Sequence, residues 1–402
     1  MRLARRTAIV AIAAVALLAV GCGSDAKPAA NKITEIKIAI AAPLAGDYAT
    51  YGKPIEDGEK QAADEIAAAG GVASGPYKGA KITIVPFDDQ LDAKQDGDIA
   101  QKVVDDPSIW AFTGLAASDG ALAAKPILAR SNVALVSSYA SSPDITKGTG
   151  GAFIIASPHA AYAGAGVAEA KAQGSSKVAI LQITGAFGDS ISGLAQKDLT
   201  AKGLSVTTVQ SMNTGDADVK AQVLAAHDSG ADTLMTVGYA SDVVAALKGA
   251  DAISWKPKLI DAGGGAFDPS VLKNAAAAAE GLTGVVDYDA GSTSAANQKL
   301  VTAYAKANSG SKDVPPPYAH GYETVTLIAK ALESGPKDRT ELAAAIAKVT
   351  LDETGVGKLR FDATGNPLDR PMWIFTVKAG KFEFTRGYTF GGSDVTPLSL
   401  QR

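Results

Sequence analysis

The sequence contains few side chains whose types and spacing would support catalysis or metal binding. Its three histidines, His159, His227 and His320, lie far apart in the chain, and none stands at metal-ligand spacing from another His or from Cys22. The motif Gly-x-x-x-x-Gly-Lys-Ser/Thr is absent, and residues 263–265 (Gly-Gly-Gly) lack the spacing Gly-x-Gly-x-x-Gly. We therefore expect no metal site, no phosphate-binding loop and no dinucleotide or other cofactor.

One short block is the remaining hint of an enzyme. Residues 188–190 read Gly-Asp-Ser, like a block of some esterases, but they lack its N-terminal position, and no Asp-x-x-His follows near the C-terminus. A hydrolase is therefore the least favoured interpretation. We expect that the protein is not an enzyme and that its chemistry is the binding of a small molecule.

Three loops rich in small and hydroxyl-bearing side chains are candidates for that binding. In residues 114–120, Ser118 opens a predicted helix and can bind a carboxylate beside the free N–H groups of the helix N-terminus. Residues 137–143 contribute four serine hydroxyls and a phenol, and residues 238–242 repeat the pattern later in the chain. Each loop alone is an ordinary capped turn. Their occurrence at equivalent strand ends favours a ligand site.

The elements that must position these loops alternate between strands and helices. Strands are predicted at 36–40, 81–87, 109–113, 133–137, 177–183, 206–209, 233–237, 258–260, 357–361, 373–378 and 381–388. Helices are predicted at 55–69, 92–105, 118–130, 159–173, 188–202, 219–229, 242–250, 269–279, 298–308, 318–334 and 339–349. Ala379-Gly380 is the expected turn of a terminal β-hairpin. The alternation, which restarts near residue 159, predicts an α/β protein with two doubly wound parallel-sheet lobes.

Composition and charge narrow the class further. Hydrophobic residues make up 47% and charged residues 20% of the 402 residues, which excludes wholesale disorder and allows two or three domains. The formal net charge is −4, and it becomes −7 without Arg2, Arg5 and Arg6. A mildly acidic protein of this kind lacks the excess positive charge that attracts nucleic acid.

The N-terminus has the pattern of a secretory signal peptide over residues 1–21. Arginines precede an almost wholly apolar run at 8–20, which is shorter than the roughly 20 residues that a membrane-spanning helix needs. Cys22, the single cysteine of the chain, follows Leu-Ala-Val-Gly, which resembles a bacterial lipobox, although Ala19 replaces the usual Leu. We expect cleavage before Cys22 and its lipidation, with residues 22–33 as a flexible tether.

An ordered series of short blocks resembles the periplasmic leucine/isoleucine/valine-binding family, which supplies branched-chain amino acid ABC transporters. The opening blocks are residues 40–46 (Ile-Ala-Ala-Pro-Leu-Ala-Gly), Tyr51-Gly52 and 64–72 (Asp-Glu-Ile-Ala-Ala-Ala-Gly-Gly-Val). The later blocks are residues 88–90, 134–137, 215–219, 230–232, 238–239, 279–281 and 361–365. The series extends in order from residue 36 to about residue 384.

The resemblance implies a type I periplasmic binding fold, in which several crossing segments join two lobes. Lobe I would comprise residues 34–155 and 288–368, and lobe II would comprise residues 156–287 and 369–392, before a C-terminal tail at 393–402. The ligand would lie in the cleft between the lobes.

The family's ligand contacts can be transferred to matching positions of this sequence. Ser118, flanked by Ala117 and Asp119 in the same loop, matches the serine that holds the ligand α-carboxylate. Tyr139 matches a position whose backbone carbonyl binds the α-ammonium, and Ser141 matches a Thr or Ser that touches both groups.

Aromatic positions complete the implied site. Tyr51 matches an aromatic wall of the first lobe and Tyr239 one of the second. Phe187 stands where the family usually has Tyr before Gly.

The sequence departs from the family at Gly264, where the family places Asp or Glu against the ligand ammonium. A buried ammonium without a counter-charge is costly. Either nearby Asp261 or Asp119 compensates, or Asp261 is a solvated strand-end residue and the ligand is not an α-amino acid. Members of this family also bind amides, urea and aromatic or aliphatic carboxylates.

The resemblance finally implies a role and partners. We expect a monomeric lipoprotein, anchored by Cys22 to the outer face of the cell membrane. It would capture a branched-chain or related amino acid and pass it to an ABC permease and its ATPase. The alternatives are a receptor for an amide, urea or small carboxylate, and a sensory domain that presents its ligand to a signalling partner.

Overall fold

The computed structural model describes residues 33–148, 150–391 and 394–398. The expected signal peptide, the lipidated Cys22 and nearly all of the tether lie outside the described residues. Within the described ranges, no helix has the length and apolar character needed to cross a membrane.

The first lobe is built on a parallel sheet of five strands in the order β2-β1-β3-β4-β5. The strands are β1 (Glu35–Ala42), β2 (Lys81–Asp88), β3 (Ile109–Gly114), β4 (Ala134–Ser137) and β5 (Ala152–Ile154). Successive side chains of β1 point to opposite faces, so Ile36 and Ile38 join one core cluster while Ala39 and Ala41 join another. The sheet is therefore buried on both sides.

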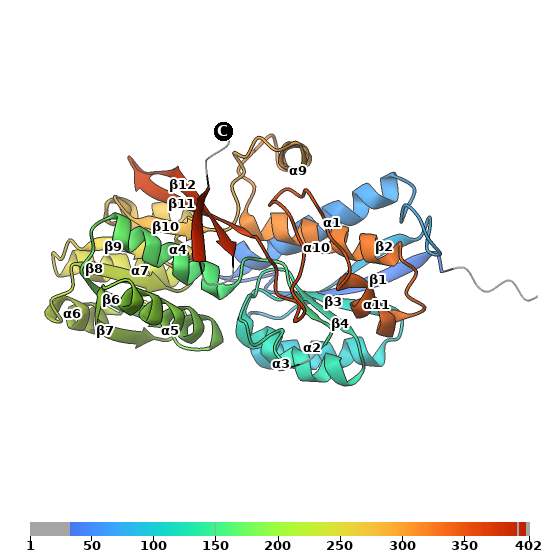
Figure 1. The fold of residues 1–402 in the computed structure, drawn as a ribbon, viewed down its shortest axis with the longest axis horizontal. Helices are drawn as coiled ribbons and strands as arrows, with labels where there is room; N and C mark the ends of the chain where they lie inside the picture. Colours follow the sequence, from blue (N-terminus) through green and yellow to red (C-terminus); the bar gives the residue numbers. More distant parts are fainter. Residues whose placement is uncertain (1–32, 149, 392–393, 399–402) are drawn as a thin grey trace, which may run out of the picture. The chain divides into compact units, whose positions relative to one another are not determined.

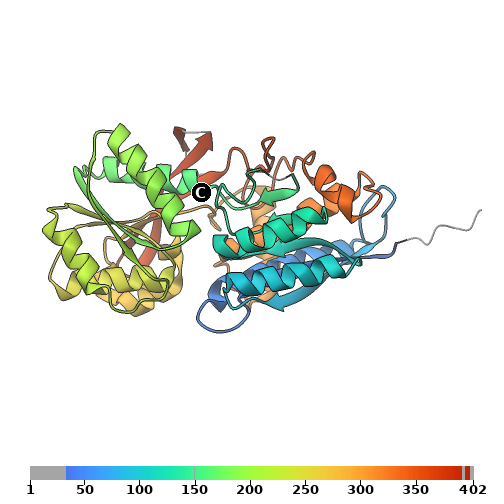
Figure 2. The ribbon, with the colours of Figure 1, turned by 90° about the horizontal axis from the view of Figure 1, so that it is seen from below.

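Helices cover both faces of this sheet. One face carries α1 (Ala49–Ala68), α10 (Pro316–Leu332) and α11 (Arg339–Ile346). The other face carries α2 (Ala93–Asp105) and α3 (Ser118–Arg130), which lie side by side (Figure 1, Figure 2). A further helix, α9 (Ala295–Ala307), packs through Leu300 and Val301 against the start of α10.

The second lobe is built on an eight-stranded sheet in the order β13-β12-β11-β10-β9-β8-β6-β7. The strands are β6 (Lys177–Ile183), β7 (Ser205–Met212), β8 (Thr233–Val237), β9 (Lys258–Asp261), β10 (Thr283–Val286), β11 (Pro371–Lys378), β12 (Lys381–Gly391) and β13 (Asp394–Leu398). The sheet is parallel from β7 to β10 and antiparallel from β10 to β13. The parallel part confirms the predicted doubly wound sheet, and the antiparallel strands β11 to β13 extend it.

Helices also cover both faces of the second sheet. One core cluster unites the sheet with α4 (His159–Ala172) and α5 (Ala186–Ala201), and another unites it with α6 (Lys220–Asp228) and α7 (Ala240–Ala252). The short α8 (Pro269–Ala275) packs beside α7. Two lobes with helices on both faces of each sheet confirm the predicted α/β class. The chain passes between them three times, after β5, after β10 and before β11.

Several predicted elements differ from the observed ones. Helix α1 begins at Ala49 instead of 55 and continues through Pro54, because Tyr51 and Gly52 are buried by tertiary packing. A Cβ at Gly52 would lie 2.0 Å from the carbonyl oxygen of Pro43, so only glycine fits there. The predicted helix 269–279 breaks at Ala276, whose φ is +43°.

Short strands account for most of the remaining differences. β5 and β10 have three and four residues, too few for a periodic pattern, and neither is predicted. Residues 357–361 form isolated bridges and not the predicted strand. Part of the expected tail, residues 394–398, forms β13. The predicted hairpin with Ala379-Gly380 at its turn is confirmed by β11 and β12.

Candidate ligand-binding site

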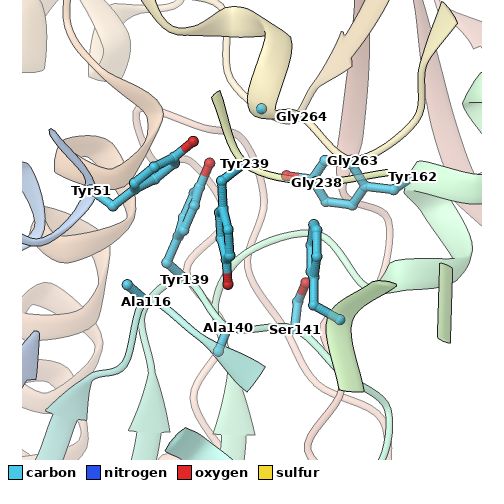
Figure 3. A pocket seen from close by; sticks show the side chains of 12 residues that line it. Tyr51, Ala116, Tyr139, Ala140, Ser141, Tyr162, Gly238, Tyr239, Gly263 and Gly264 are labelled. Atoms are coloured by element: carbon cyan, nitrogen blue, oxygen red, sulfur yellow. The ribbon is translucent and has the colours of Figure 1, made fainter. Parts of the chain in front are cut away.

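A cavity lies between the two lobes, where the carboxyl ends of strands from both sheets meet (Figure 3). The volume open to a bound molecule is about 20 Å³, so the surrounding side chains nearly fill the cavity in this structure. Its lining comes from the loops after β3, β4, β8 and β9 and from the starts of α1, α4 and α5. The lining residues are Tyr51, Ala116, Tyr139, Ala140, Ser141, Tyr162, Phe187, Gly238, Tyr239, Gly263, Gly264 and Gly265.

Five aromatic rings dominate the walls, and four of the five are predicted site residues. The rings of Tyr51 and Tyr239 lie 5.4 Å apart, and Phe187 stacks on Tyr239 at 5.5 Å with an interplanar angle of 9°. Tyr51 is 6.1 Å from Tyr139. Burial raises the pKa of all four tyrosines, so the phenols remain neutral at physiological pH. The structure thus brings the rings of Tyr51, Tyr139, Phe187 and Tyr239 together at one cavity.

Tyr162, the fifth ring, was not predicted. It lies in the first turn of α4, inside a helix that the sequence predicts correctly, but helical periodicity alone gives no sign that this face meets a cavity. The one feature that could have indicated Tyr162 is its position shortly after the chain crossing that follows β5.

The predicted hydroxyl groups divide between the lining and its surroundings. Ser141 lines the cavity. Ser118 begins α3 two residues after the lining residue Ala116; it is 1% exposed, and its Oγ has no hydrogen-bond partner among the described residues. Ala117, between them, is half-buried. Ser118 and the α3 N-terminus together can bind an anion, although the structure does not place Ser118 in the lining itself.

Asp119 makes a contact between the lobes instead of facing the cavity. It is exposed, and its Oδ1 accepts a hydrogen bond of 3.1 Å from the backbone N–H of Ala186, the first residue of α5. Its carboxylate therefore caps a helix of the other lobe.

Gly264 leaves little room for an acidic side chain. Its φ is +82°, a region that disfavours other residues, and a Cβ would lie 3.0 Å from Cε1 of Tyr162. The Tyr162 ring therefore occupies the space beside this glycine (Figure 3).

Asp261 is buried behind the glycine loop and holds it in place. Its Oδ1 accepts hydrogen bonds from the hydroxyl of Thr236 (3.0 Å) and the N–H of Gly263 (3.3 Å), and its Oδ2 accepts one from the N–H of Ala266 (3.0 Å). Burial raises its pKa to about 6. An interpretation of Asp261 as a solvated strand-end residue is therefore wrong. Neither Asp261 nor Asp119 belongs to the cavity lining.

A second buried acid, Glu59, supports the loops of the first lobe. Its carboxyl accepts hydrogen bonds from the hydroxyls of Thr113 (2.8 Å) and Ser138 (3.0 Å), directly before the lining residue Tyr139. Burial raises its pKa to about 8, so it is largely protonated at neutral pH. Its role depends on tertiary contacts that the helical pattern around it does not encode.

Comparison with known proteins shows which family the chain resembles. Residues 35–381 match the family described as periplasmic binding protein. The chain belongs to this family. A Pseudomonas aeruginosa leucine-, isoleucine-, valine-, threonine- and alanine-binding protein is 28% identical over 364 residues, which cover 87% of this chain and 91% of that protein.

Two solved structures illustrate the range of ligands among structurally similar binding proteins. The leucine-binding protein LivK of Thermotoga maritima has a TM-score of 0.81 at 22% identity, covering 89% of this chain and 99% of that one. A solute-binding protein of R. palustris in complex with 4-hydroxybenzoate has a TM-score of 0.78 at 20% identity, covering 92% and 98%. This periplasmic binding protein therefore shares its fold with proteins that bind chemically different ligands. The family resemblance is confirmed, and the chain is a binding protein and not an enzyme.

Proposed function

We propose that this protein is the exported receptor of an ABC importer and captures a small carboxylate in the cavity between its lobes. The family match supports a solute-binding role, and the convergence of strand ends from both sheets on one cavity supports the ligand's position. The lobe boundaries 34–155 with 288–368 and 156–287 with 369–392, the monomeric state and the anchor at Cys22 belong to the same proposal.

The absence of charge in the cavity lining carries the ligand assignment. None of the lining residues in the described part of the chain bears a charged side chain. Ser141, the buried hydroxyl of Ser118 and the α3 N-terminus can bind a carboxylate without a counter-ion. A desolvated ammonium would face aromatic rings, the Ser141 hydroxyl and backbone groups but no carboxylate of the lining, and burial of a charge without a counter-charge is unfavourable. We infer a carboxylate with an uncharged, apolar body, in keeping with the R. palustris proteins bound to benzoate and 4-hydroxybenzoate.

A branched-chain amino acid is the second candidate, and one observation favours it. Asp261 is fully buried and, with a pKa near 6, is largely ionised at neutral pH, directly behind the lining residue Gly263. Its charge is balanced only by neutral donors and would attract an ammonium. The relative from P. aeruginosa, named for binding leucine and similar amino acids, supports this alternative.

A matched pair of ligands separates the two candidates. L-leucine and 4-methyl-2-oxopentanoate differ only at C2, where a keto oxygen replaces the ammonium and the hydrogen, and benzoate and 4-hydroxybenzoate add the aromatic class. Each is tested by thermal unfolding, since a ligand at a hundred times its Kd stabilises by about 2.7 kcal/mol. We expect the keto acid or an aromatic acid to raise Tm and L-leucine to have little effect.

The Asp261→Asn variant is the matched protein control. If leucine is the ligand, this variant loses leucine binding and keeps any binding of the keto acid. If none of the four compounds raises Tm, the proposed function is wrong.

A further inference from the structure

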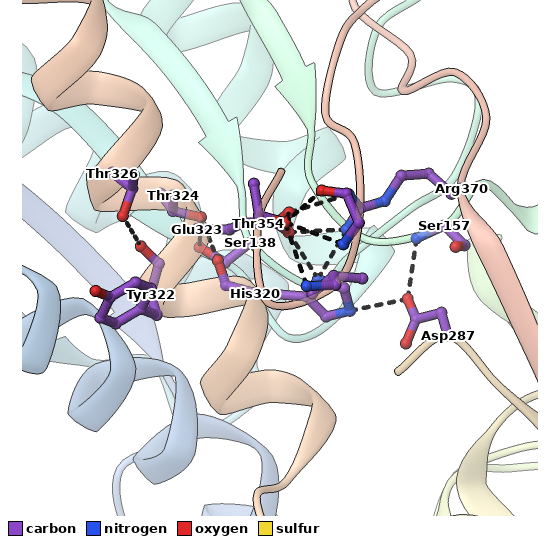
Figure 4. A network of polar contacts seen from close by, with 12 residues as sticks. Ser138, Ser157, Asp287, His320, Tyr322, Glu323, Thr324, Thr326, Thr354 and Arg370 are labelled. Carbon is purple, nitrogen blue, oxygen red and sulfur yellow. Dashed lines mark hydrogen bonds and ion pairs between the residues drawn. The ribbon is translucent and has the colours of Figure 1, made fainter. Parts of the chain in front are cut away.

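A buried network of charged side chains lies where the chain crosses between the lobes (Figure 4). Asp287 follows β10, Arg370 precedes β11, and His320 and Glu323 are one turn apart on α10. All four are at most 3% exposed. The third crossing joins the network through Ser157, after β5, whose N–H donates to Asp287 Oδ2 at 3.0 Å.

The contacts form two linked ion pairs. Arg370 donates from Nη1 to Glu323 Oε1 at 3.0 Å and from Nη2 to Oε2 at 2.8 Å. His320 Nε2 lies 2.9 Å from Asp287 Oδ2, and its Nδ1 lies 3.5 Å from Glu323 Oε2. With the imidazole protonated, two cations balance two anions, as buried charges require. Loss of that proton leaves Asp287 without its ion-pair partner, and Arg370 is then the cation near it.

The network reaches the wall of the ligand cavity. The His320 ring lies 6.0 Å from the ring of Tyr139, which lines the cavity. Asp287 is close enough to two lining tyrosines, Tyr139 and Tyr162, to add to the effect of burial in raising their pKa values. A change in the His320–Asp287 pair therefore affects both the chain crossings and the wall of the cavity.

We propose that His320 is a positioning residue of the ligand cavity, whose proton ties α10 to the crossing after β10 and makes ligand affinity depend on pH. This inference rests on the proposed function for its ligand-binding part only. The contacts of His320 with Asp287 and Tyr139 carry it, since they join the crossings to the cavity wall.

The direction of the pH dependence follows from the groups that face the imidazole, which are Asp287, Glu323, Arg370 and the neutral Tyr139. Burial lowers the pKa of His320, and so does Arg370, but Asp287 and Glu323 outweigh them and raise it above 6.5. Opening of the lobes that separates His320 from Asp287 removes the main favourable partner and lowers this pKa. Closure then takes up a proton, so affinity is highest below the pKa of the open form. It falls as pH rises through the pKa of the closed form.

The first test needs no ligand. In NMR spectra of the full chain, loss of a signal in His227→Gln identifies the exposed His227. His159, whose pKa burial lowers to about 3, stays neutral between pH 5 and 9, so the third imidazole signal belongs to His320. We expect its midpoint above 6.5. A midpoint below 6.5 would overturn the inference, and this readout stands even if His320 variants fail to fold.

The second test compares His320→Gln with the control His227→Gln in unfolding and in ligand binding from pH 5.5 to 9. Wild type should be more stable than His320→Gln at low pH, and this advantage should shrink as pH rises through the folded-state pKa. The Kd of wild type for 4-methyl-2-oxopentanoate or L-leucine should rise tenfold for each unit by which closure raises the pKa. His320→Gln should lose this dependence, and His227→Gln should keep it.

The outcomes separate the two proposals. A stability difference between wild type and His320→Gln that is constant with pH would indicate a packing role alone and would overturn the inference. The same pH profile of Kd in both proteins would also overturn it. A third outcome is that wild type binds none of the probes while the NMR and stability results are as expected. That outcome would count against the proposed function, but it would still support the protonated His320–Asp287 pair.

Discussion

Three buried carboxyls, those of Glu59, Asp261 and Asp287, surround the candidate cavity without lining it. Glu59 is held by two hydroxyls, Asp261 mainly by backbone N–H groups, and Asp287 by an imidazole. Burial raises the pKa of Glu59 to about 8 and that of Asp261 to about 6, whereas His320 outweighs burial and lowers that of Asp287. The donors around each acid thus decide whether it is neutral or charged beside a bound ligand.

Glu59→Gln should change the pH dependence of stability. The folded-state pKa of Glu59, about 8, exceeds its ordinary value of 4.5, so the folded protein binds the proton more tightly than the unfolded chain does. Wild type should therefore lose about 1.4 kcal/mol of unfolding free energy per pH unit between these values, in addition to the contributions of other groups. The variant, whose amide resembles the protonated acid, should lack this component. Urea unfolding at pH 5, 6, 7 and 8 measures the difference.

Glu65→Gln is a control on the same helix, because the pKa of Glu65 is lowered instead of raised. The difference in unfolding free energy between Glu65→Gln and wild type should not increase as the pH rises from 5 to 8. Parallel pH profiles for wild type and Glu59→Gln would show that Glu59 is ionised in the folded protein.

At the scale of elements, the lobes meet through side chains of the first lobe that bond to helix N-termini of the second. Tyr51, in α1, accepts a hydrogen bond of 3.0 Å from the N–H of Ala240, the first residue of α7. Asp119, in α3, accepts one from the N–H of Ala186, the first residue of α5. The free N–H groups of a helix N-terminus need acceptors, and here the opposite lobe provides them.

The sequence predicts the loops of this site well because they obey a simple rule. Strands at 109–113, 133–137, 233–237 and 258–260 are predicted nearly as observed, and in a parallel sheet their carboxyl ends share one edge. The polar and glycine-rich segments that follow them therefore come together as expected. Short β5 and β10, which have few residues in which to show a pattern, are missed. The lobe boundaries beside them come from the family resemblance and not from a local pattern.

Residues that act through tertiary contacts could not be predicted. Glu59 and Tyr162 lie on helices whose patterns explain them as ordinary helical residues, and only the packing of distant segments brings them to the cavity. The His320–Asp287 and Arg370–Glu323 pairs join residues 33 and 47 positions apart, from segments without a motif. Asp261, expected to be solvated, is likewise a buried loop support because of tertiary contacts that the sequence pattern does not show.

At the scale of the whole molecule, the proposal includes an anchor at Cys22, outside the described residues. Cys22→Ser should release the protein from the membrane fraction without changing its fold, because firm retention depends on the several acyl chains of a bacterial lipoprotein. Fractionation followed by washing measures the distribution, and unchanged thermal unfolding of the released protein is the control. Retention of Cys22→Ser in washed membranes would contradict the anchor.

Binding between the lobes also implies a change in the whole molecule. A ligand that touches loops of both lobes favours the closed arrangement, and the three crossings are the segments that can absorb the rotation. The contacts of Tyr51 with Ala240 and of Asp119 with Ala186 then form on closure.

Small-angle X-ray scattering with and without a saturating ligand tests this central claim most directly. The ligand is the one identified by thermal unfolding, and its occupancy is confirmed by calorimetry on the same samples. Closure of the lobes should give a smaller radius of gyration when the ligand is bound. An unchanged scattering curve at confirmed saturation would contradict capture of the ligand by closure of the two lobes.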